Sequence, residues 1–213
     1  MIIRPRVLFR GIRLAGHKSP TQQLPAERIA VPTEVAIPLS QHAGAPAQPI
    51  VEAGQAVKRG ELIAVSAGNV SSNIHASVSG TVKEVGARSN GCGGKTDFIV
   101  ITASETQEDA FLPALKNPTS EEIISRIEEC GIVGMGGAGF PTHVKLHPTV
   151  AVDTLILNGA ECEPYLTCDD ALMQEKCAEF VRGAKYLAKA LNVCRILIAI
   201  EQNIPPALAL FVK

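Results

Sequence analysis

The sequence is poor in aromatic and charged side chains, and it contains no tryptophan. Aromatic residues make up 4% of the 213 residues, charged residues make up 19%, and the formal net charge is only −1. Nucleic-acid-binding proteins use aromatic side chains as stacking platforms and basic runs as phosphate-binding surfaces. Neither feature is present, so the composition argues against a nucleic-acid partner.

Long apolar runs are also absent. The longest candidate, residues 195–201, has the length of a strand, whereas a membrane-spanning helix needs about 20 apolar residues. The first 13 residues are basic and partly apolar, but they have no signal-peptide core or cleavage site. We therefore expect no direct membrane span and a location on the cytoplasmic side.

The sequence has no CxxC pair, although it contains six cysteines. They are Cys92, Cys130, Cys162, Cys168, Cys177 and Cys194. Zinc sites and iron–sulfur clusters generally need more closely spaced ligands. We therefore expect free, reduced thiols and no metal-binding residue in this chain.

Glycine, in contrast, is concentrated in residues 131–145, which read GIVGMGGAGFPTHVK. Five of these fifteen residues are glycine. A dense glycine cluster favours close approach of the backbone to a phosphate, with N–H groups pointing at the anion. Lys145 adds a positive charge just beyond the loop. We predict a phosphate-binding loop; the alternative is an ordinary tight turn, which needs only about one or two glycines.

Residues 30–104 have the pattern of an all-β domain, preceded by an N-terminal arm, residues 1–29, that we expect to pack on it. The expected strands cover residues 34–39, 49–51, 61–65, 81–85 and 98–102, with glycine-containing turns between them. Such evenly spaced short strands predict a small barrel or sandwich.

Two stretches of this domain, residues 51–64 and 74–82, resemble the two halves of a biotinyl or lipoyl carrier. The interval between them, residues 66–73, has no lysine to modify. We therefore predict a barrel-sandwich hybrid fold without biotin or lipoate. A lone histidine is more often structural than catalytic, so we assign structural roles to His42 and His75.

After a polar linker, residues 105–118, a second domain is predicted over residues 119–213. Thr119 and Glu122 have capping-box spacing, and Gly131 suits the end of the helix that they begin. A buried strand over residues 151–157 is followed by one helix over about 169–191, capped by Thr167 and Asp170, and by a strand over 195–200. A further helix begins near Pro205 and is cut by the chain end, so we expect a piece of a longer protein.

Residues 134–139 match the GxGxxG pattern letter for letter. The ordinary dinucleotide-binding fold requires a strand before this pattern and a helix after it. Here a predicted helix comes before it. We therefore reject the ordinary Rossmann assignment and keep the anion-binding prediction.

Polar residues at the end of the 151–157 strand complete the predicted site. Asn158, Glu161 and Glu163 can bind ribityl or ribose hydroxyls and ring N–H groups. With the glycine loop and Lys145 they predict a site for a flavin mononucleotide or a nicotinamide nucleotide. A solvated acidic turn is the alternative. No Ser–His–Asp or Cys–His arrangement indicates hydrolysis, and no residue is assigned as catalytic.

Residues 134–145 (GMGGAGFPTHVK) and 157–165 (LNGAECEPY) resemble the C subunit of the Rnf electron-transport complex, the RnfC/RsxC family. That family is related to the flavin- and NADH-binding subunit of respiratory complex I. The barrel-sandwich segment shares the resemblance, so it covers nearly the whole chain. It implies an α+β protein, in which a barrel-sandwich hybrid is followed by an incomplete α/β, Rossmann-like domain of the complex I flavin-subunit type.

The resemblance also implies roles for particular residues. FMN and NAD(H) would be lined by Gly134, Gly136, Gly137 and Gly139. Phe140 would stack near the nicotinamide nucleotide, and Lys145 would bind phosphate. Asn158 would hold the flavin, with Glu161 and Glu163 beside it, while Ala160 stands where the complex I relative has an aspartate. Two four-iron four-sulfur (4Fe-4S) clusters of the family would lie downstream of this chain.

As a function, the resemblance implies hydride exchange between NAD(H) and FMN, followed by electron transfer through 4Fe-4S clusters to ferredoxin or membrane partners, coupled to ion translocation. The partners would be the other Rnf subunits, which would hold the protein at the cytoplasmic face of the inner membrane. This chain alone is expected to be inactive. The alternatives are a non-catalytic assembly module and a relative of the A subunit of a sodium-pumping NADH:quinone reductase.

Overall fold

The computed structural model describes residues 15–89, 93–135, 137 and 139–200. The chain divides into two compact units. The first unit contains residues 28–155 and 184–196, and the described part of the second contains residues 15–27, 156–183 and 197–200. The predicted all-β domain and the glycine loop therefore belong to the same unit.

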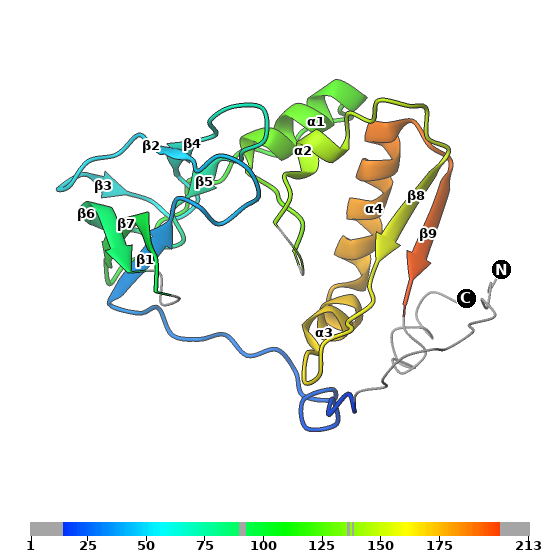
Figure 1. Cartoon of the computed structure of the whole chain (residues 1–213), viewed down its shortest axis with the longest axis horizontal. Helices are drawn as coiled ribbons and strands as arrows, with labels where there is room; N and C mark the ends of the chain where they lie inside the picture. Colours follow the sequence, from blue (N-terminus) through cyan, green and yellow to red (C-terminus); the bar gives the residue numbers. More distant parts are fainter. Residues whose placement is uncertain (1–14, 90–92, 136, 138, 201–213) are drawn as a thin grey trace. The chain divides into compact units, whose positions relative to one another are not determined.

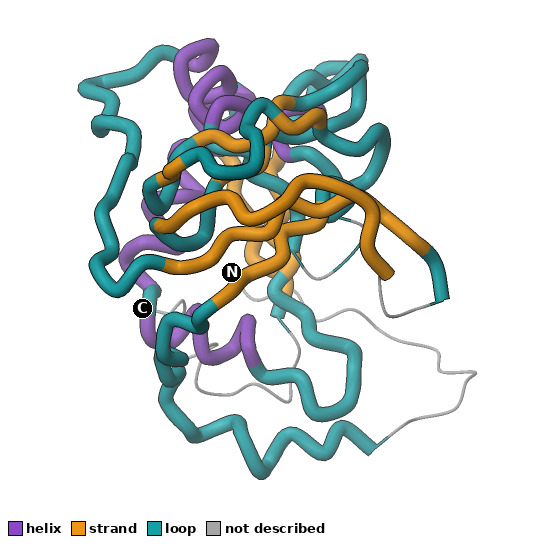
Figure 2. Tube along the Cα trace, turned by 90° about the vertical axis from the view of Figure 1, so that its left-hand side faces the viewer, coloured by secondary structure: helices purple, strands orange, loops and turns teal. Residues whose placement is uncertain are grey.

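Short antiparallel strands form two sheets in the first unit (Figure 1). They are β1 (Glu34–Pro38), β2 (Gln48–Pro49), β3 (Ala56–Val57), β4 (Leu62–Val65), β5 (Ile74–His75), β6 (Gly80–Ser89) and β7 (Lys95–Ala103). One sheet has the order β1-β7-β6-β3 and the other β2-β4-β5. Figure 2 shows these strands in orange, lying side by side. The five predicted strands are present, whereas β3 and β5 were missed.

The core of this domain consists of aliphatic side chains from both sheets. Ile63 on β4 and Ile99 and Ile101 on β7 are completely buried and belong to one cluster. In the antiparallel register, Ile101 lies opposite Val35 on one side and Val82 on the other. Each such buried side chain contributes about 1.5–3 kcal/mol. Burial between two sheets thus confirms the predicted sandwich-like core.

Residues 105–111 follow the surface of the β domain. The backbone N–H of Arg59 donates to Glu108 O at 3.0 Å, and the N–H of Ala110 donates to Arg59 O at 2.8 Å. Ser79 Oγ donates to Glu108 O at 2.7 Å. This part of the predicted linker is therefore fixed to the β domain by backbone hydrogen bonds.

Helix α1 (Ser120–Glu129) begins and ends as its sequence predicts. Both hydrogen bonds of the Thr119–Glu122 capping box are present. At the other end, Gly131 has a φ of 64°, and the N–H of Ile132 donates to Ile127 O at 3.1 Å. This is the Schellman arrangement that favours glycine. Ile123 and Ile127 pack in a cluster with Leu146, directly after α2 (Thr142–Lys145).

The remaining elements are β8 (Thr154–Asn158), α3 (Cys168–Glu175), α4 (Cys177–Leu191) and β9 (Arg195–Ala199). β8 and β9 form a two-stranded sheet, and their arrows run the same way in Figure 1. The helix predicted at Pro205 lies outside the described residues. In the described part, no helix has the length and hydropathy needed to cross a membrane.

The prediction of a single helix over residues 169–191 is wrong, because the helix is interrupted at Lys176, between α3 and α4. Met173 of α3 packs in a cluster with Phe180 of α4 and Ile200, whereas Ala190 near the end of α4 belongs to the cluster with α1. In one straight helix, Met173 and Phe180 would lie about two turns apart. The break therefore allows these two side chains to pack together.

Residues 15–27 of the N-terminal arm belong to the second unit, which corrects the expectation that the arm packs on the β domain. The N–H of Tyr165 donates to Gly16 O at 2.8 Å, and the N–H of Ala26 donates to a carboxylate oxygen of Glu175 at 2.7 Å. The rings of His17 and Tyr165 stack with centroids 5.1 Å apart. The arm therefore lies along the segment that contains the predicted acidic residues.

Candidate functional site

The glycine loop is closed at its base like a short hairpin. Val133 and Pro141 form an antiparallel bridge. The N–H of Gly134 donates to Phe140 O, and the N–H of Thr142 donates to Ile132 O, each at 2.9 Å. Since α2 starts at Thr142, this closure fixes where the helix begins. Gly136 lies outside the described residues.

The described glycines of the loop are needed for different reasons. Gly139 has a φ of 61°, and a Cβ there would lie 3.1 Å from Gln41 O. Gly137 is exposed, and a Cβ there would meet no atom within 4 Å. Both the positive φ and the close backbone therefore favour glycine at position 139. At position 137 the described structure contains nothing that requires it.

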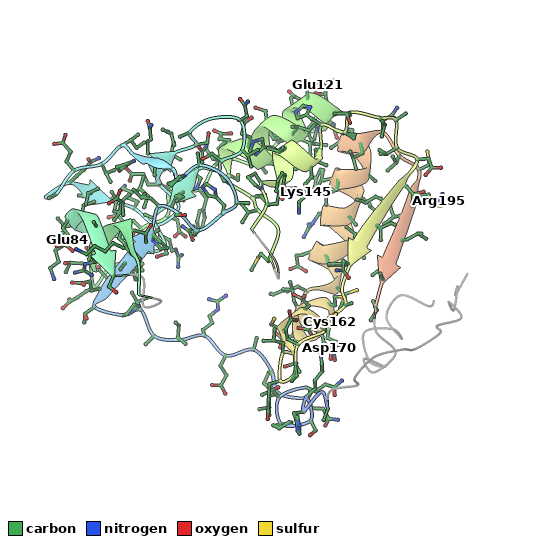
Figure 3. The ribbon with its side chains drawn as sticks, in the orientation of Figure 1. Glu84, Glu121, Lys145, Cys162, Asp170 and Arg195 are labelled. Carbon is green, nitrogen blue, oxygen red and sulfur yellow. The ribbon has the colours of Figure 1, made fainter. Side chains whose placement is uncertain are left out.

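Lys145, Phe140 and Gly134 are brought together in the first unit. A Cβ added to Gly134 would lie 2.7 Å from Lys145 Nζ, so the ammonium group lies against the loop backbone. The same ammonium is 5.9 Å from the centroid of the Phe140 ring. Figure 3 shows Lys145 at the end of α2. An exposed cation and an aromatic ring thus flank the glycine backbone, an arrangement that suits a phosphate-bearing ligand.

The other predicted residues, Asn158, Glu161 and Glu163, lie in the second unit. Asn158 ends β8, and its side-chain oxygen accepts the N–H of Ala160 at 3.2 Å. Asn158 and Glu163 are exposed. Glu161, in contrast, is only 3% exposed.

The buried Glu161 carboxylate caps helix α3. Its oxygens accept the N–H groups of Asp169 at 2.8 Å and Asp170 at 3.3 Å. Thr167 occupies the N-cap position but makes no side-chain cap, so the predicted capping by Thr167 and Asp170 is wrong. A carboxylate is favoured here because it satisfies free N–H groups and faces the positive end of the helix dipole.

Further polar groups surround Glu161. The buried Lys18 donates its Nζ proton to the backbone oxygen of Glu161 at 2.5 Å. Burial, and then the charges of Glu161 and Glu163, raise the pKa of the Asp169 carboxyl. Burial and a hydrogen bond to Glu161 raise the pKa of the Cys168 thiol. One ligand atom from each of Glu161, Cys168 and Asp169 lies within 4.8 Å of the others. Helix capping accounts for this grouping.

No disulfide joins the cysteines among the described residues, which are Cys130, Cys162, Cys168, Cys177 and Cys194. Cys92 lies outside the described residues.

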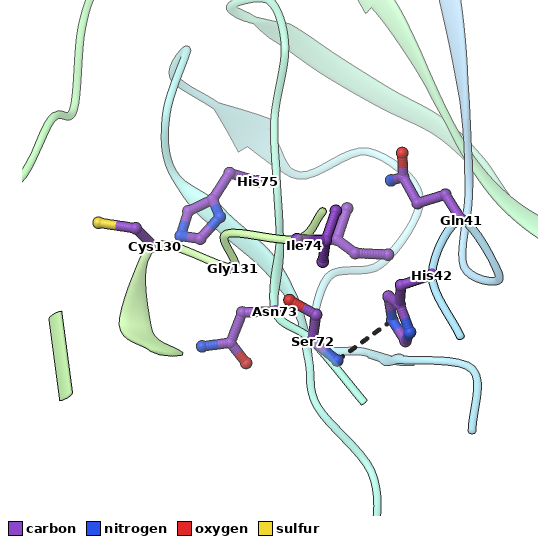
Figure 4. Close-up of a pocket in the computed structure, with 9 residues that line it drawn as sticks. Gln41, His42, Ser72, Asn73, Ile74, His75, Cys130 and Gly131 are labelled. Carbon is purple, nitrogen blue, oxygen red and sulfur yellow. Dashed lines mark hydrogen bonds between the residues drawn. The ribbon is translucent and has the colours of Figure 1, made fainter. Parts of the chain in front are cut away.

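A small pocket of about 210 Å³ lies in the first unit, between the β domain and the residues after α1. Figure 4 shows His75 and Cys130 at one side of it and His42 at the other. The N–H of Ser72 donates to His42 Nε2 at 3.2 Å. Ser72 Oγ is buried without a partner among the described residues. Sequence reasoning missed this pocket because its walls come from three separated segments.

Comparisons with known proteins match two parts of the chain to different family models. Residues 7–106 match the family model of the RnfC barrel sandwich hybrid domain, and residues 127–213 match that of the Nuo51 FMN-binding domain. The chain is 43% identical over 205 residues to the C subunit of the ion-translocating oxidoreductase complex of Rhodobacter capsulatus, covering 93% of this chain and 40% of that protein. These matches confirm the predicted barrel-sandwich hybrid and the flavin-subunit relationship.

Two further relatives are similar over nearly the whole chain. One is the C subunit of the proton-translocating ferredoxin:NAD(+) oxidoreductase complex of Clostridium ljungdahlii, 43% identical over 93% of this chain and 45% of that protein. The other is the C subunit of the Na(+)-translocating ferredoxin:NAD(+) oxidoreductase complex of Acetobacterium woodii, 39% identical over 95% of this chain and 47% of that protein. The chain thus spans less than half the length of each of these three relatives.

The cap by Glu161 predicts a stability effect that exposed Glu163 should not show. Glu161→Gln removes the acceptor charge from the start of α3 while keeping the side-chain size. We expect a loss of about 1 kcal/mol, typical of an N-cap, which makes amide hydrogen exchange in α3 about fivefold faster. Glu163→Gln removes the same charge and is the matched control. Equal exchange rates in the two variants would contradict the cap.

The partly buried His75 side chain is expected to make the stability of the protein depend on pH. Burial lowers the pKa of its imidazole below the usual 6.5, against the opposing charge of Glu129. The unfolded chain then binds more protons, so this contribution to stability is fully present above pH 6.5 and is lost as the pH falls through the lowered pKa. His75→Gln should reduce this fall in the free energy of unfolding, which is measured by urea unfolding at pH values above and below 6.5. His147→Gln, at an exposed histidine, should retain the wild-type slope. A wild-type slope in both variants contradicts the assignment.

Proposed function

Because this chain belongs to the family of Rnf-complex C subunits, we propose that it forms the FMN- and NAD(H)-binding part of an electron-transferring oxidoreductase subunit. The main support for this proposal is the glycine loop. It falls within the stretch that matches the Nuo51 FMN-binding domain. Its exposed Gly137 and the adjacent Lys145 ammonium offer a phosphate both backbone access and a positive charge.

The local structure fits a nucleotide phosphate in three respects. Gly137 has open space where a side chain would stand, and its N–H has no hydrogen-bond partner among the described residues. Lys145 holds its ammonium against Gly134. Phe140 supplies a half-buried ring within reach of that ammonium. Backbone N–H groups and a lysine are the donors that phosphate oxygens accept from.

In this proposal the residues of the chain bind and orient, whereas the cofactor supplies the redox chemistry. FMN, when bound, accepts a hydride as two electrons and releases electrons one at a time. Lys145 neutralises phosphate charge, and Gly134, Gly136, Gly137 and Gly139 let the backbone approach it. Phe140 offers a face on which a nucleotide ring can stack.

Asn158, Glu161 and Glu163 of the second unit also contribute to cofactor binding in this proposal. Asn158 and Glu163 are exposed and present an amide and a carboxylate to flavin or nicotinamide groups. Glu161 acts indirectly, because its carboxylate is occupied by α3 and holds the 158–163 turn to that helix. Ala160 stands where the complex I relative has an aspartate, so this chain would lack that carboxylate contact.

The wider function follows from the relatives and is proposed on the same basis. The full protein would carry 4Fe-4S clusters and pass electrons between NAD(H) and ferredoxin or membrane partners, coupled to ion translocation. Other Rnf subunits would hold it at the cytoplasmic face of the inner membrane. The second unit would be part of a Rossmann-like domain. A non-catalytic assembly role predicts a full-length protein that binds no flavin.

Substitution of Gly137 tests the loop. Gly137→Leu in the full-length protein should abolish FMN binding, because the new side chain fills the approach of the phosphate, while its Cβ meets no atom of the described residues within 4 Å. Flavin content after purification gives the measurement. Gly183→Leu is the control, since a Cβ at Gly183 also meets nothing within 4 Å. Full flavin occupancy in the Gly137 variant would show that the phosphate binds elsewhere.

Lys145 is predicted to contribute charge rather than structure. Lys145→Ala should weaken nucleotide binding by about 1–3 kcal/mol, the cost of one charge-assisted hydrogen bond. FMN and NADH affinities, measured by titration of the full-length protein, check this. Lys185→Ala removes an exposed lysine of α4 and should leave both affinities unchanged. Wild-type affinities and NADH oxidation in the Lys145 variant argue against its role.

A further inference from the structure

The β domain is attached to the start of the glycine loop through Asn73. The side-chain Nδ2 of Asn73 donates to the backbone oxygens of Glu128 and Glu129, each at 3.3 Å. Both carbonyls lie in the last turn of α1, and that of Glu128 also accepts the N–H of Gly131 at 2.9 Å. The side-chain oxygen of Asn73 accepts the N–H of Ser66 at 2.9 Å. One side chain therefore ties the interval 66–73 to the end of α1.

Gly131 makes this contact possible. Its hypothetical Cβ would lie 2.1 Å from Asn73 O, and no side chain fits at that distance. Gly131 also has a positive φ, which ends the helix. The first glycine of the loop therefore serves two needs, the turn out of α1 and the close approach of the β domain.

A second attachment holds the other end of the loop. The N–H of Ala43 donates to Gly139 O at 3.1 Å. A Cβ on Gly139 would lie 3.1 Å from Gln41 O, so glycine again allows two backbones to approach. The loop is thus held at residues 131 and 139, while Gly137 between them stays exposed.

The pocket of Figure 4 lies between these two attachments. Gln41 and His42 line it from the second attachment, and Asn73 and Gly131 line it from the first. The hydrogen bond from Ser72 N–H to His42 Nε2 joins the two β-domain segments across it. The segments that hold the loop are therefore also held to each other.

From this geometry we propose that the β domain is a clamp that sets the conformation of the glycine loop, and that Asn73 is its principal positioning residue. The inference rests on the proposed nucleotide role of the loop. The interval 66–73, which has no lysine to carry a prosthetic group, acts here as a fixed contact. Asn73 does not touch the nucleotide; it acts through Gly131 and the base of the loop.

The test replaces Asn73 with aspartate in the full-length protein. Aspartate retains the acceptor for Ser66 but turns the donor into an oxygen that faces two helix C-terminal carbonyls, where negative charge is unfavourable. Asn69→Asp is the matched control, because Asn69 is exposed in the same interval and receives the same charge change. Asn73→Ala removes the donor without adding charge and serves if the aspartate variant does not fold.

Two readouts separate positioning from general destabilisation. The first is amide hydrogen exchange at the loop ends, residues 131–134 and 139–142, with β7 as internal reference. The second is the dissociation constant of added FMN, followed by quenching of flavin fluorescence. We expect Asn73→Asp to raise both the exchange rate and the FMN dissociation constant about tenfold, the effect of losing one or two hydrogen bonds. Asn69→Asp should change neither, and β7 should exchange at the wild-type rate.

If amide hydrogen exchange at the loop ends is equally fast in the Asn73 and Asn69 variants, the β domain does not clamp the loop. Faster exchange with an unchanged FMN dissociation constant would overturn the positioning role of Asn73. If the wild-type full-length protein binds no FMN, the proposed function fails. The exchange comparison then decides alone whether the clamp holds the loop.

Discussion

The absence of a Cβ at Gly131 and Gly139 is the constraint on which the first unit depends. Each glycine has a positive φ, and the backbone of the β domain leaves no room for a Cβ at Gly131 and only a tight fit for one at Gly139. Two sheets and a helix–loop segment can therefore meet backbone to backbone. Such contacts are stiffer than contacts between flexible side chains, since no rotamer change relieves them. The described ends of the loop, next to Gly131 and Gly139, are therefore fixed to the β domain.

Stiffness at the base of the loop matters for binding as well as for folding. A loop that is already ordered loses less conformational entropy when an anion binds than a free loop does. Gly137 stays exposed between the attachments, and glycine there would otherwise cost backbone entropy without return. In the proposed site, access of a phosphate to the backbone would be the reason for glycine at position 137, whereas the positive φ favours glycine at positions 131 and 139.

How far the sequence predicts the fold depends on how local the signal is. Both ends of α1 follow from Thr119, Glu122 and Gly131, because capping acts over one turn. The break at Lys176 was not predictable, since α3 and α4 continue one apolar pattern and the packing of Phe180 on Met173 across the break is a tertiary contact. The two-residue strands β3 and β5 are too short to produce a periodicity. Local signals therefore predict the elements, and tertiary contacts set their limits.

The same distinction applies to the site. The motif residues from Gly134 to Lys145 are identifiable because they are adjacent in sequence, whereas Asn73 meets Glu128 across 55 positions. The sequence points to Glu161 as a ligand-binding residue, but its hydrogen bonds lead to α3. A buried carboxylate needs donors, and helix N–H groups supply them at lower desolvation cost than an exposed ligand contact would require. An acidic residue in a binding motif can therefore act by fixing the turn from which its neighbours reach the ligand.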